Sequence, residues 1–282
     1  MNAQFFSFKK PHGAIPCYTW DVPQPEAVLI LIHGLKSHAG WSLETGAEFA
    51  LRKIKVYAFD RMGSGRSEFL RGHIEDYRIW LEDIRFILQL AKKENPGCPL
   101  HLLGHCFGAR LAMAFAAAYP QEAETLTLIA PPLFSLKAGL TLLEKLKVAC
   151  ALLLGRQCRV RVPIRDGMFT SNPEKDRFIR EDPLKLEMMT SDFCREILRI
   201  DGHIRKNLSK IRIPTLVLLA YGDEVVDNER IAKRLFANLK CRRKALEIFD
   251  CRHYLFFESL REKVIEKIAD WIKPGKIQGI KS

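Results

Sequence analysis

Long apolar runs are missing from this sequence. No segment approaches the roughly 18 consecutive apolar residues that a membrane-spanning helix requires. The N-terminus, which reads MNAQFFSFKK, is too short and too polar to resemble a secretory signal. These absences argue against an integral membrane protein and a secreted protein. We therefore expect a cytoplasmic protein, with peripheral attachment to a membrane surface as the alternative.

Paired cysteines are also missing. The chain has eight cysteines, yet none belongs to a Cys-x-x-Cys pair and their spacing is irregular. This pattern indicates neither a zinc site nor a disulfide framework, so we expect reduced thiols. The sequence predicts no metal ion and no cofactor.

Acidic residues are scarcer than basic ones. Asp and Glu number 33 against 45 Lys and Arg, which leaves a formal net charge of +12. No helix-turn-helix, RNP or zinc-finger signature accompanies this charge, so we expect no nucleic-acid partner. An anionic membrane surface, the phosphates of acyl-CoA or an acidic acyl-carrier protein fit better, and a solvated charged surface is the simpler alternative. The densest basic clusters span Arg156–Arg165, Lys240–Lys244 and Lys273–Lys281.

Short apolar stretches alternate with helical patterns along the chain. Core strands are expected at residues 28–32, 56–59, 100–103, 126–129, 215–220 and 245–249. Helices are expected between and after them, at residues 74–94, 109–119, 228–239 and 261–271. This alternation is typical of a mostly parallel central sheet flanked by helices, an α/β fold.

The alternation stops between residues 131 and 213, where helical patterns occur without a further core strand. We expect a helical cap here, inserted into a core made of residues 1–130 and 214–282. Within the cap, a helical pattern over residues 140–154 carries an apolar stripe of Leu140, Leu143, Leu146, Ala151 and Leu154. The simplest prediction packs this stripe on the body of the protein. The alternative is an acyl-chain wall or a membrane-touching lid, because the stripe leads into the arginine cluster.

An expected strand, a tight turn and an expected helix meet at the sequence GHCFG. This is the Gly-x-nucleophile-x-Gly elbow of an α/β-hydrolase, with Cys106 at the nucleophile position. Gly104 and Gly108 lack the Cβ atoms that would keep strand and helix apart. We therefore predict that Cys106 is a nucleophile. The alternative is that it is a small buried residue, the common fate of a free cysteine.

A nucleophile of this kind needs a base and an acid that orients the base. In this fold the three residues follow in the order nucleophile, acid, His, on loops at the carboxyl ends of strands. Asp223 follows the expected strand 215–220, and His253 follows the expected strand 245–249. We predict that Cys106, Asp223 and His253 form a catalytic triad.

Four other residues compete for these roles. Asp227 lies near the start of the next helix, so a helix N-cap is its expected role. Asp250 is too close in sequence to His253 to be favoured as its orienting acid. His203 lies in the cap and His105 lies beside the elbow, and we expect both to be structural.

An oxyanion hole requires two backbone amides, one after the nucleophile and one in the loop after the first core strand. Phe107 supplies the first amide. The loop HGLKSH supplies the second, and we predict that it comes from Leu35, with His33 and Gly34 shaping a tight turn. The alternative for this loop is an ordinary glycine turn after a strand.

These motifs together resemble the monoacylglycerol lipase and lysophospholipase-like branch of the α/β-hydrolases, which also carries the name serine aminopeptidase-like. The sequence HGLKSH is similar to the HGxxxH loop of that branch, and Phe59–Glu68 is similar to its FDxxGxGxSE turn. Residues 80–131 follow the pattern around the elbow, and residues 182–184 match a recurrent Asp-Pro-Leu. The resemblance extends from about residue 15 to residue 271, but Cys106 stands where the branch has Ser.

The resemblance implies a small-molecule acyl substrate and an acyl-enzyme intermediate. The leading hypothesis is hydrolysis of a lipid ester, such as a monoacylglycerol or a lysophospholipid, by the Cys-His-Asp triad. A thiolate nucleophile forms a thioester that other acceptors attack readily. The alternative is therefore a thioesterase or acyltransferase that acts on acyl-CoA or on an acyl-carrier protein. A third hypothesis is a receptor without catalysis, because a fold does not fix a function.

Overall fold

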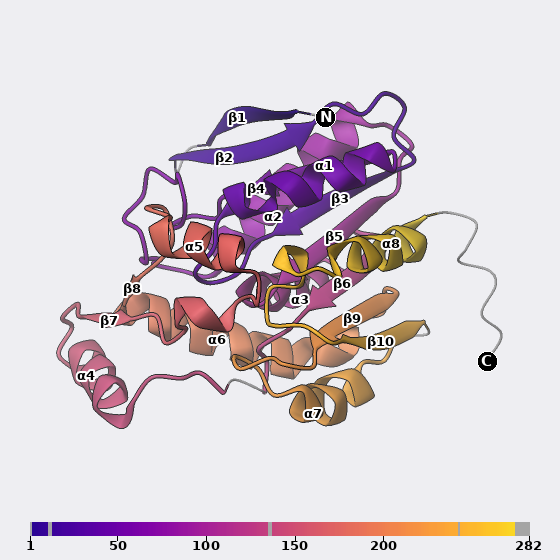
Figure 1. Ribbon diagram of the computed structural model, residues 1–282. Coiled ribbons are helices and arrows are strands. Elements are labelled where there is room, and N and C mark those ends of the chain that lie inside the picture. Colours follow the sequence, from indigo (N-terminus) through magenta and orange to yellow (C-terminus); the bar gives the residue numbers. More distant parts are fainter. Residues whose placement is uncertain (1, 11–12, 135–136, 242, 274–282) are drawn as a thin grey trace.

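The computed structural model describes residues 2–10, 13–134, 137–241 and 243–273. These residues form an eight-stranded sheet in the order β1-β2-β4-β3-β5-β6-β9-β10 (Figure 1). The strands from β4 to β10 are parallel, whereas β2 pairs antiparallel with both β1 and β4. Their bounds are Ala3–Lys10 (β1), Gly13–Trp20 (β2), Ala27–Ile32 (β3), Ile54–Phe59 (β4), Leu100–His105 (β5), Thr125–Ile129 (β6), Thr215–Ala220 (β9) and Lys244–Phe249 (β10).

The six predicted strands all occur in this sheet. Every residue of β3 and β5 is buried, because helices cover both faces of the parallel part. The main helices of the core are α1 (Leu43–Leu51), α2 (Arg78–Glu94), α3 (Phe107–Ala118) and α8 (Arg261–Ile272). The predicted mostly parallel sheet flanked by helices is therefore confirmed.

The predicted helix over residues 228–239 is helical but irregular. It begins as α7 (Asn228–Arg230), continues as a π-helical turn over Ile231–Leu235 and ends as a 3-10 turn over Phe236–Asn238. Asp227 is the N-cap, as predicted, since its Oδ1 accepts a hydrogen bond from the amide of Arg230 at 3.1 Å.

Residues 137–213 carry α4 (Leu142–Leu153), α5 (Pro173–Glu181), α6 (Ser191–Asn207) and a small separate hairpin. The hairpin pairs β7 (Arg159–Arg161) with β8 (Met188–Thr190) in antiparallel fashion, and it was not predicted. Asp182, of the Asp-Pro-Leu motif, ties this region to the core: its Oδ2 accepts hydrogen bonds from Trp41 Nε1 at 2.7 Å and from His38 Nε2 at 3.1 Å.

The prediction that the apolar stripe of residues 140–154 packs on the body is confirmed only for Leu140 and Ala151 and is wrong for its other three leucines. Leu143 is 77% exposed, Leu146 54% and Leu154 68%. The buried residues of α4 are Val148 and Ala151, whereas Leu143 and Leu146 face solvent. Figure 1 shows α4 at the margin of the molecule, away from the central sheet.

The N-terminal hairpin β1–β2 was not predicted either. Two other sequence features lie outside the described residues: Arg242 of the second basic cluster, and the basic C-terminal segment beyond Lys273. No helix among the described residues is both long and apolar enough to span a bilayer.

Candidate active site

Cys106 lies in a strained turn between β5 and α3. Its φ is 51°, in the left-handed region that residues with a side chain rarely adopt. The two flanking glycines make this turn possible: a Cβ on Gly104 would lie 2.3 Å from the carbonyl oxygen of Gly108, and one on Gly108 would lie 2.0 Å from that of Ile32. The local structure is therefore the elbow that the sequence predicts.

His253 and Asp223 form a fully buried pair. His253 Nδ1 donates to Asp223 Oδ2 at 2.7 Å, and neither side chain is accessible to solvent. The other carboxylate oxygen, Oδ1, accepts from the amides of Val225 and Val226 at 2.7 and 3.0 Å. Asp223 is thus held in place by three hydrogen bonds, in the orientation that an acid needs to fix an imidazole tautomer.

Charges around His253 favour its protonated form. Burial alone would lower the pKa of His253, but the carboxylate of Asp223 and a thiolate at Cys106 together raise it above its ordinary value. For Asp223, burial acts to raise the pKa, and the charge and hydrogen bond of His253 outweigh it and lower the pKa. A side-chain hydrogen bond with Cys106 also acts to raise the pKa of His253, and among the described residues no other group bonds to His253 Nε2.

His105 holds the loop that carries His253. Its Nε2 donates to the backbone carbonyl of His253 at 3.0 Å, and the two rings lie edge to face with centroids 5.0 Å apart. Burial lowers the pKa of His105 to about 3, so its ring is neutral at physiological pH. The predicted structural role of His105 agrees with these contacts.

The loop after β3 turns its carbonyl oxygens toward the protein. Gly34 N donates to Ser37 Oγ at 2.9 Å, and the carbonyl of Gly34 contacts His33 Nδ1 at 2.9 Å. In the part of the chain that the structure describes, the amides of Leu35 and Phe107 donate no hydrogen bond to another residue. Leu35 and Phe107 both line the cavity that Cys106 lines, and an oxyanion hole requires donors at this place.

Arg61 is a residue that the sequence reasoning missed. Its Nη2 donates to the carbonyls of Leu35 at 2.7 Å and Gly34 at 3.3 Å. These two hydrogen bonds hold the loop after β3 in place. The guanidinium is buried against aromatic rings, that of Phe107 lying 4.9 Å away. Burial lowers the pKa of Arg61 to about 9, although the negative charges of Asp60 and Cys106 act to raise it. The only signal was its place in the FDRMGSGRSE motif.

Cys106 opens onto an apolar cavity of about 550 Å³. The walls come from the elbow, from α4 and from α6, and they are mainly aliphatic. They include Leu140, Val148, Leu152, Ile164, Met189, Ile197 and Leu198. A cavity of this size and character fits the acyl chain of a lipid. Arg110 also lines the cavity, and its Nε forms an ion pair with Asp201 Oδ1 at 2.7 Å.

The chain is similar to known lipases over almost its whole length. A family model described as "Serine aminopeptidase, S33" matches residues 23–260. Monoglyceride lipase of Homo sapiens is 25% identical over 261 residues, which cover 91% of this chain and 86% of the human protein. The "Probable lysophospholipase L2" of Haemophilus influenzae is 24% identical over 274 residues, which cover 88% and 86%.

Solved structures give the same fold. A soluble variant of monoglyceride lipase from Saccharomyces cerevisiae, in complex with a substrate analog, has a TM-score of 0.83 at 16% identity. The match covers 96% of this chain and 95% of the yeast chain. The monoacylglycerol lipase of Paleococcus ferrophilus has a TM-score of 0.79 at 23% identity, with 92% and 98% covered. The predicted α/β-hydrolase fold is confirmed.

Proposed function

The chain is an α/β-hydrolase of the serine aminopeptidase S33 family, and we propose that it hydrolyses carboxylic esters of lipids through Cys106, His253 and Asp223. The observation that carries this proposal is the arrangement at the elbow. A strained cysteine lines an apolar cavity together with Leu35 and Phe107, and a buried His-Asp pair interacts with that cysteine. These are the components of acyl transfer through a covalent intermediate.

In the first half of the reaction, Cys106 Sγ attacks the ester carbonyl carbon. A C–S bond forms while the carbonyl electrons move onto oxygen, and the amides of Leu35 and Phe107 stabilise that oxyanion. The C–O bond to the alcohol then breaks, and His253 gives its Nε2 proton to the leaving alkoxide. The products are the free alcohol and a thioester on Cys106.

In the second half, water replaces the alcohol. His253 Nε2 takes a proton from the water as its oxygen attacks the thioester carbon, and the C–S bond breaks. The fatty acid leaves, and the thiolate and imidazolium are restored. Asp223 keeps the imidazole oriented through both halves.

The substrate class rests on two supports. Relatives of this chain are named as monoglyceride lipases and lysophospholipases. The aliphatic cavity of about 550 Å³ beside Cys106 accommodates a medium or long acyl chain. We therefore assign monoacylglycerols, lysophospholipids or similar single-chain esters as substrates, without a cofactor.

Intact-mass spectrometry tests the proposal. The protein is incubated with a panel of acyl esters, and the mass of a trapped acyl group identifies both the substrate class and the nucleophile. Cys106→Ala should gain no acyl mass, whereas Cys106→Ser should gain it as an oxygen ester. If fatty-acyl glycerol, lysophospholipid and nitrophenyl esters all remain intact with the unaltered protein, the proposal is overturned and a receptor without catalysis becomes the better hypothesis.

A second candidate function is supported by the sulfur atom and by the net charge of +12. A thioester on Cys106 reacts readily with amines, thiols and alcohols, so the chain could act on acyl-CoA or on an acidic acyl-carrier protein as a thioesterase or acyltransferase. Incubation with acyl-carrier thioester, with and without an amine acceptor, tests this. Retention of the acyl group on the carrier in both cases would sink the second candidate.

We further propose a cytoplasmic protein that works at a membrane surface. One side of α4 exposes four leucines, which are Leu142, Leu143, Leu146 and Leu153. The next residue after the helix, Leu154, is also exposed. Lys147 and Arg156 lie nearby in the sequence and suit anionic head groups. Such a surface would let single-chain lipids pass from a bilayer toward the apolar cavity.

A further inference from the structure

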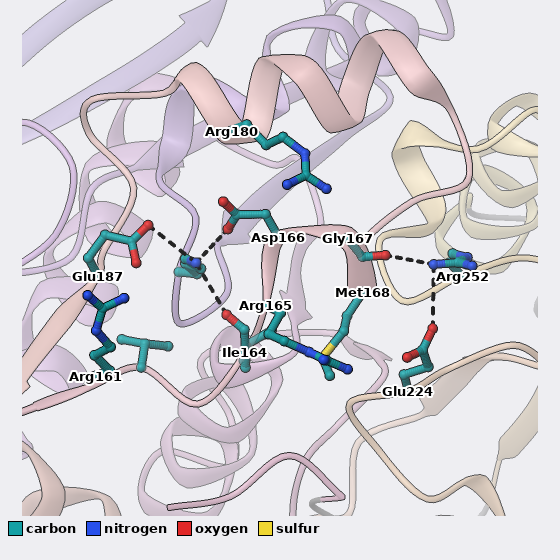
Figure 2. Close-up of a pocket in the computed structure, with 12 residues that line it drawn as sticks. Arg161, Ile164, Arg165, Asp166, Gly167, Met168, Arg180, Glu187, Glu224 and Arg252 are labelled. Carbon is teal, nitrogen blue, oxygen red and sulfur yellow. Dashed lines mark hydrogen bonds and ion pairs between the residues drawn. The ribbon is translucent and has the colours of Figure 1, made fainter.

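A second cavity, of about 590 Å³, lies beside the candidate active site (Figure 2). Three of the residues that line it are sequence neighbours of the predicted site residues: Lys36 follows Leu35, Glu224 follows Asp223 and Arg252 precedes His253. Ile164 lines both this cavity and the apolar one. The charged cavity is therefore bordered by chain neighbours of three predicted site residues, and it shares Ile164 with the apolar cavity.

Basic residues outnumber acidic ones in the lining of the second cavity. The basic residues are Lys36, Arg161, Arg165, Arg180 and Arg252, and the acidic residues are Asp166, Glu187 and Glu224. Figure 2 shows Arg180 across the cavity from Arg161 and Arg165. The lining thus carries a positive excess on two of its sides.

Every acidic residue of the lining already has a basic partner. Lys36 Nζ, which is buried, lies 2.5 Å from Asp166 and 3.4 Å from Glu187, and Arg252 lies 3.4 Å from Glu224. By contrast, the guanidinium groups of Arg161 and Arg165, which are exposed residues, have no hydrogen bond, ion pair or ring contact with any described residue. Two guanidinium groups at this cavity are therefore left for an anion from outside the chain.

We propose that this cavity binds a phosphate group on the alcohol part of the substrate, with Arg161 and Arg165 as its main ligands. The inference rests on the proposed ester hydrolysis, and it narrows the substrate class to acylglycerol phosphates. The acyl chain occupies the apolar cavity, the ester lies at Cys106, and the glycerol carries the phosphate into the charged cavity. Guanidinium groups suit this ligand because their paired N–H donors match phosphate oxygens.

Steady-state kinetics with two substrates of the same acyl chain test the proposal. One is 1-acylglycerol, and the other is 1-acylglycerol 3-phosphate. We expect the unaltered protein to have the higher kcat/KM for the phosphate ester. The double variant Arg161→Gln/Arg165→Gln should lower kcat/KM for the phosphate ester about tenfold or more, since charge-assisted hydrogen bonds are lost. Its kcat/KM for the neutral ester should stay within about twofold.

Arg159→Gln is the matched control. Arg159 is an exposed arginine on β7, the strand that also carries Arg161, but Arg159 does not line the cavity. It should leave both substrates unaffected. If Arg159→Gln reduced phosphate-ester hydrolysis as much as the double variant does, general surface charge would explain the effect and the subsite would be refuted.

Two further measurements distinguish a glycerol phosphate from other phosphate-containing ligands, and failure of the subsite from failure of the proposed function. Inorganic phosphate and glycerol 3-phosphate are tested as inhibitors, and acyl-CoA is tested as a substrate; the proposal requires glycerol 3-phosphate to inhibit more strongly than inorganic phosphate. Preference for acyl-CoA over the acylglycerol phosphate would overturn it. Equal hydrolysis of the neutral and phosphate esters refutes the subsite alone, whereas no hydrolysis of any ester refutes the proposed function.

Discussion

The hydrogen bond between Asp223 and His253 is 2.7 Å long and inaccessible to water, so its loss should change the ionisation of the imidazole. In Asp223→Asn the carboxylate no longer raises the pKa of His253, while burial still lowers it. The imidazolium is therefore lost at lower pH. We expect the alkaline limb of the pH–kcat/KM profile to move to lower pH, and kcat to fall about a thousandfold.

Asp227→Asn is the control for that prediction. Asp227 lies in the same turn and caps a helix through one hydrogen bond, a role that Asn also fills. Its pH profile should match that of the unaltered protein. An unshifted alkaline limb in Asp223→Asn would contradict the assignment of Asp223.

Gly108 is predicted to tolerate no side chain. An added Cβ would lie 2.0 Å from the carbonyl oxygen of Ile32 and 2.6 Å from that of His33, and backbone atoms cannot turn aside as a side chain can. We expect Gly108→Ala to lower the free energy of unfolding by about 3 kcal/mol, measured by urea denaturation. Gly202→Ala, on α6 with open space around it, should raise it by about 0.5 to 1 kcal/mol.

Arg61 is predicted to position the oxyanion loop rather than to touch the substrate. Arg61→Met keeps an apolar stem among the rings but removes the donors to the carbonyls of Gly34 and Leu35. We expect kcat to fall about tenfold with little change in KM, and Arg61→Lys to restore part of the loss. A fall in unfolding free energy without the change in kcat would indicate a purely structural role.

The contact between Asp223 and His253 could be predicted from the sequence because fold order and spacing constrain both residues. The catalytic roles of Cys106, Asp223 and His253, and those of Leu35 and Phe107, rest on the same geometry and stay predictions. Arg61 could not be predicted, because an arginine in a turn is usually solvated and only the folded chain shows three rings around it. The charged cavity was equally hidden, since residues from distant parts of the chain line it.

At the scale of elements, α4 provides the clearest prediction. Leu143 and Leu153 are 77% and 86% exposed and do not line the apolar cavity. Leu143→Gln/Leu153→Gln should therefore change the free energy of unfolding by less than about 1 kcal/mol. Binding to lipid vesicles, measured by co-sedimentation, should fall severalfold because apolar area no longer enters the bilayer.

Hydrolysis of a short, water-soluble nitrophenyl ester is the control, and it should be unchanged in this variant. Full vesicle binding by the double variant would contradict a membrane role for α4.

The fully buried strands β3 and β5 were easier to predict than the exposed edge strand β1. The residues of β3 and β5 are apolar throughout because both faces of the sheet are covered. By contrast, β1 is an edge strand whose residues are mostly exposed, so its sequence shows neither an apolar run nor a clear alternation. The packing of the apolar stripe of residues 140–154 was difficult to predict for a related reason. An amphipathic pattern predicts a helix, but it does not show what the apolar face of that helix contacts.

At the scale of the whole molecule, the net charge of +12 should make membrane binding depend on salt. Exposed charges are screened over about 10 Å at 0.1 M salt and over about 3 Å at 1 M. We expect binding to anionic vesicles to weaken severalfold as salt rises through this range. Binding to neutral vesicles, which depends on the leucines alone, should change little, and an equal loss on both vesicle types would argue against an electrostatic contribution.

The steric demands of the elbow lie in its two glycines and not in the residue between them. A Cβ added to Gly104 or Gly108 would clash with backbone atoms, whereas the side chain of Cys106 lines a cavity. A change of the reacting atom at position 106 therefore leaves the scaffold intact, whereas a side chain at either flanking position would destabilise it. For the evolution of this enzyme, a change of chemistry at position 106 is a single step that requires no compensating change in the fold.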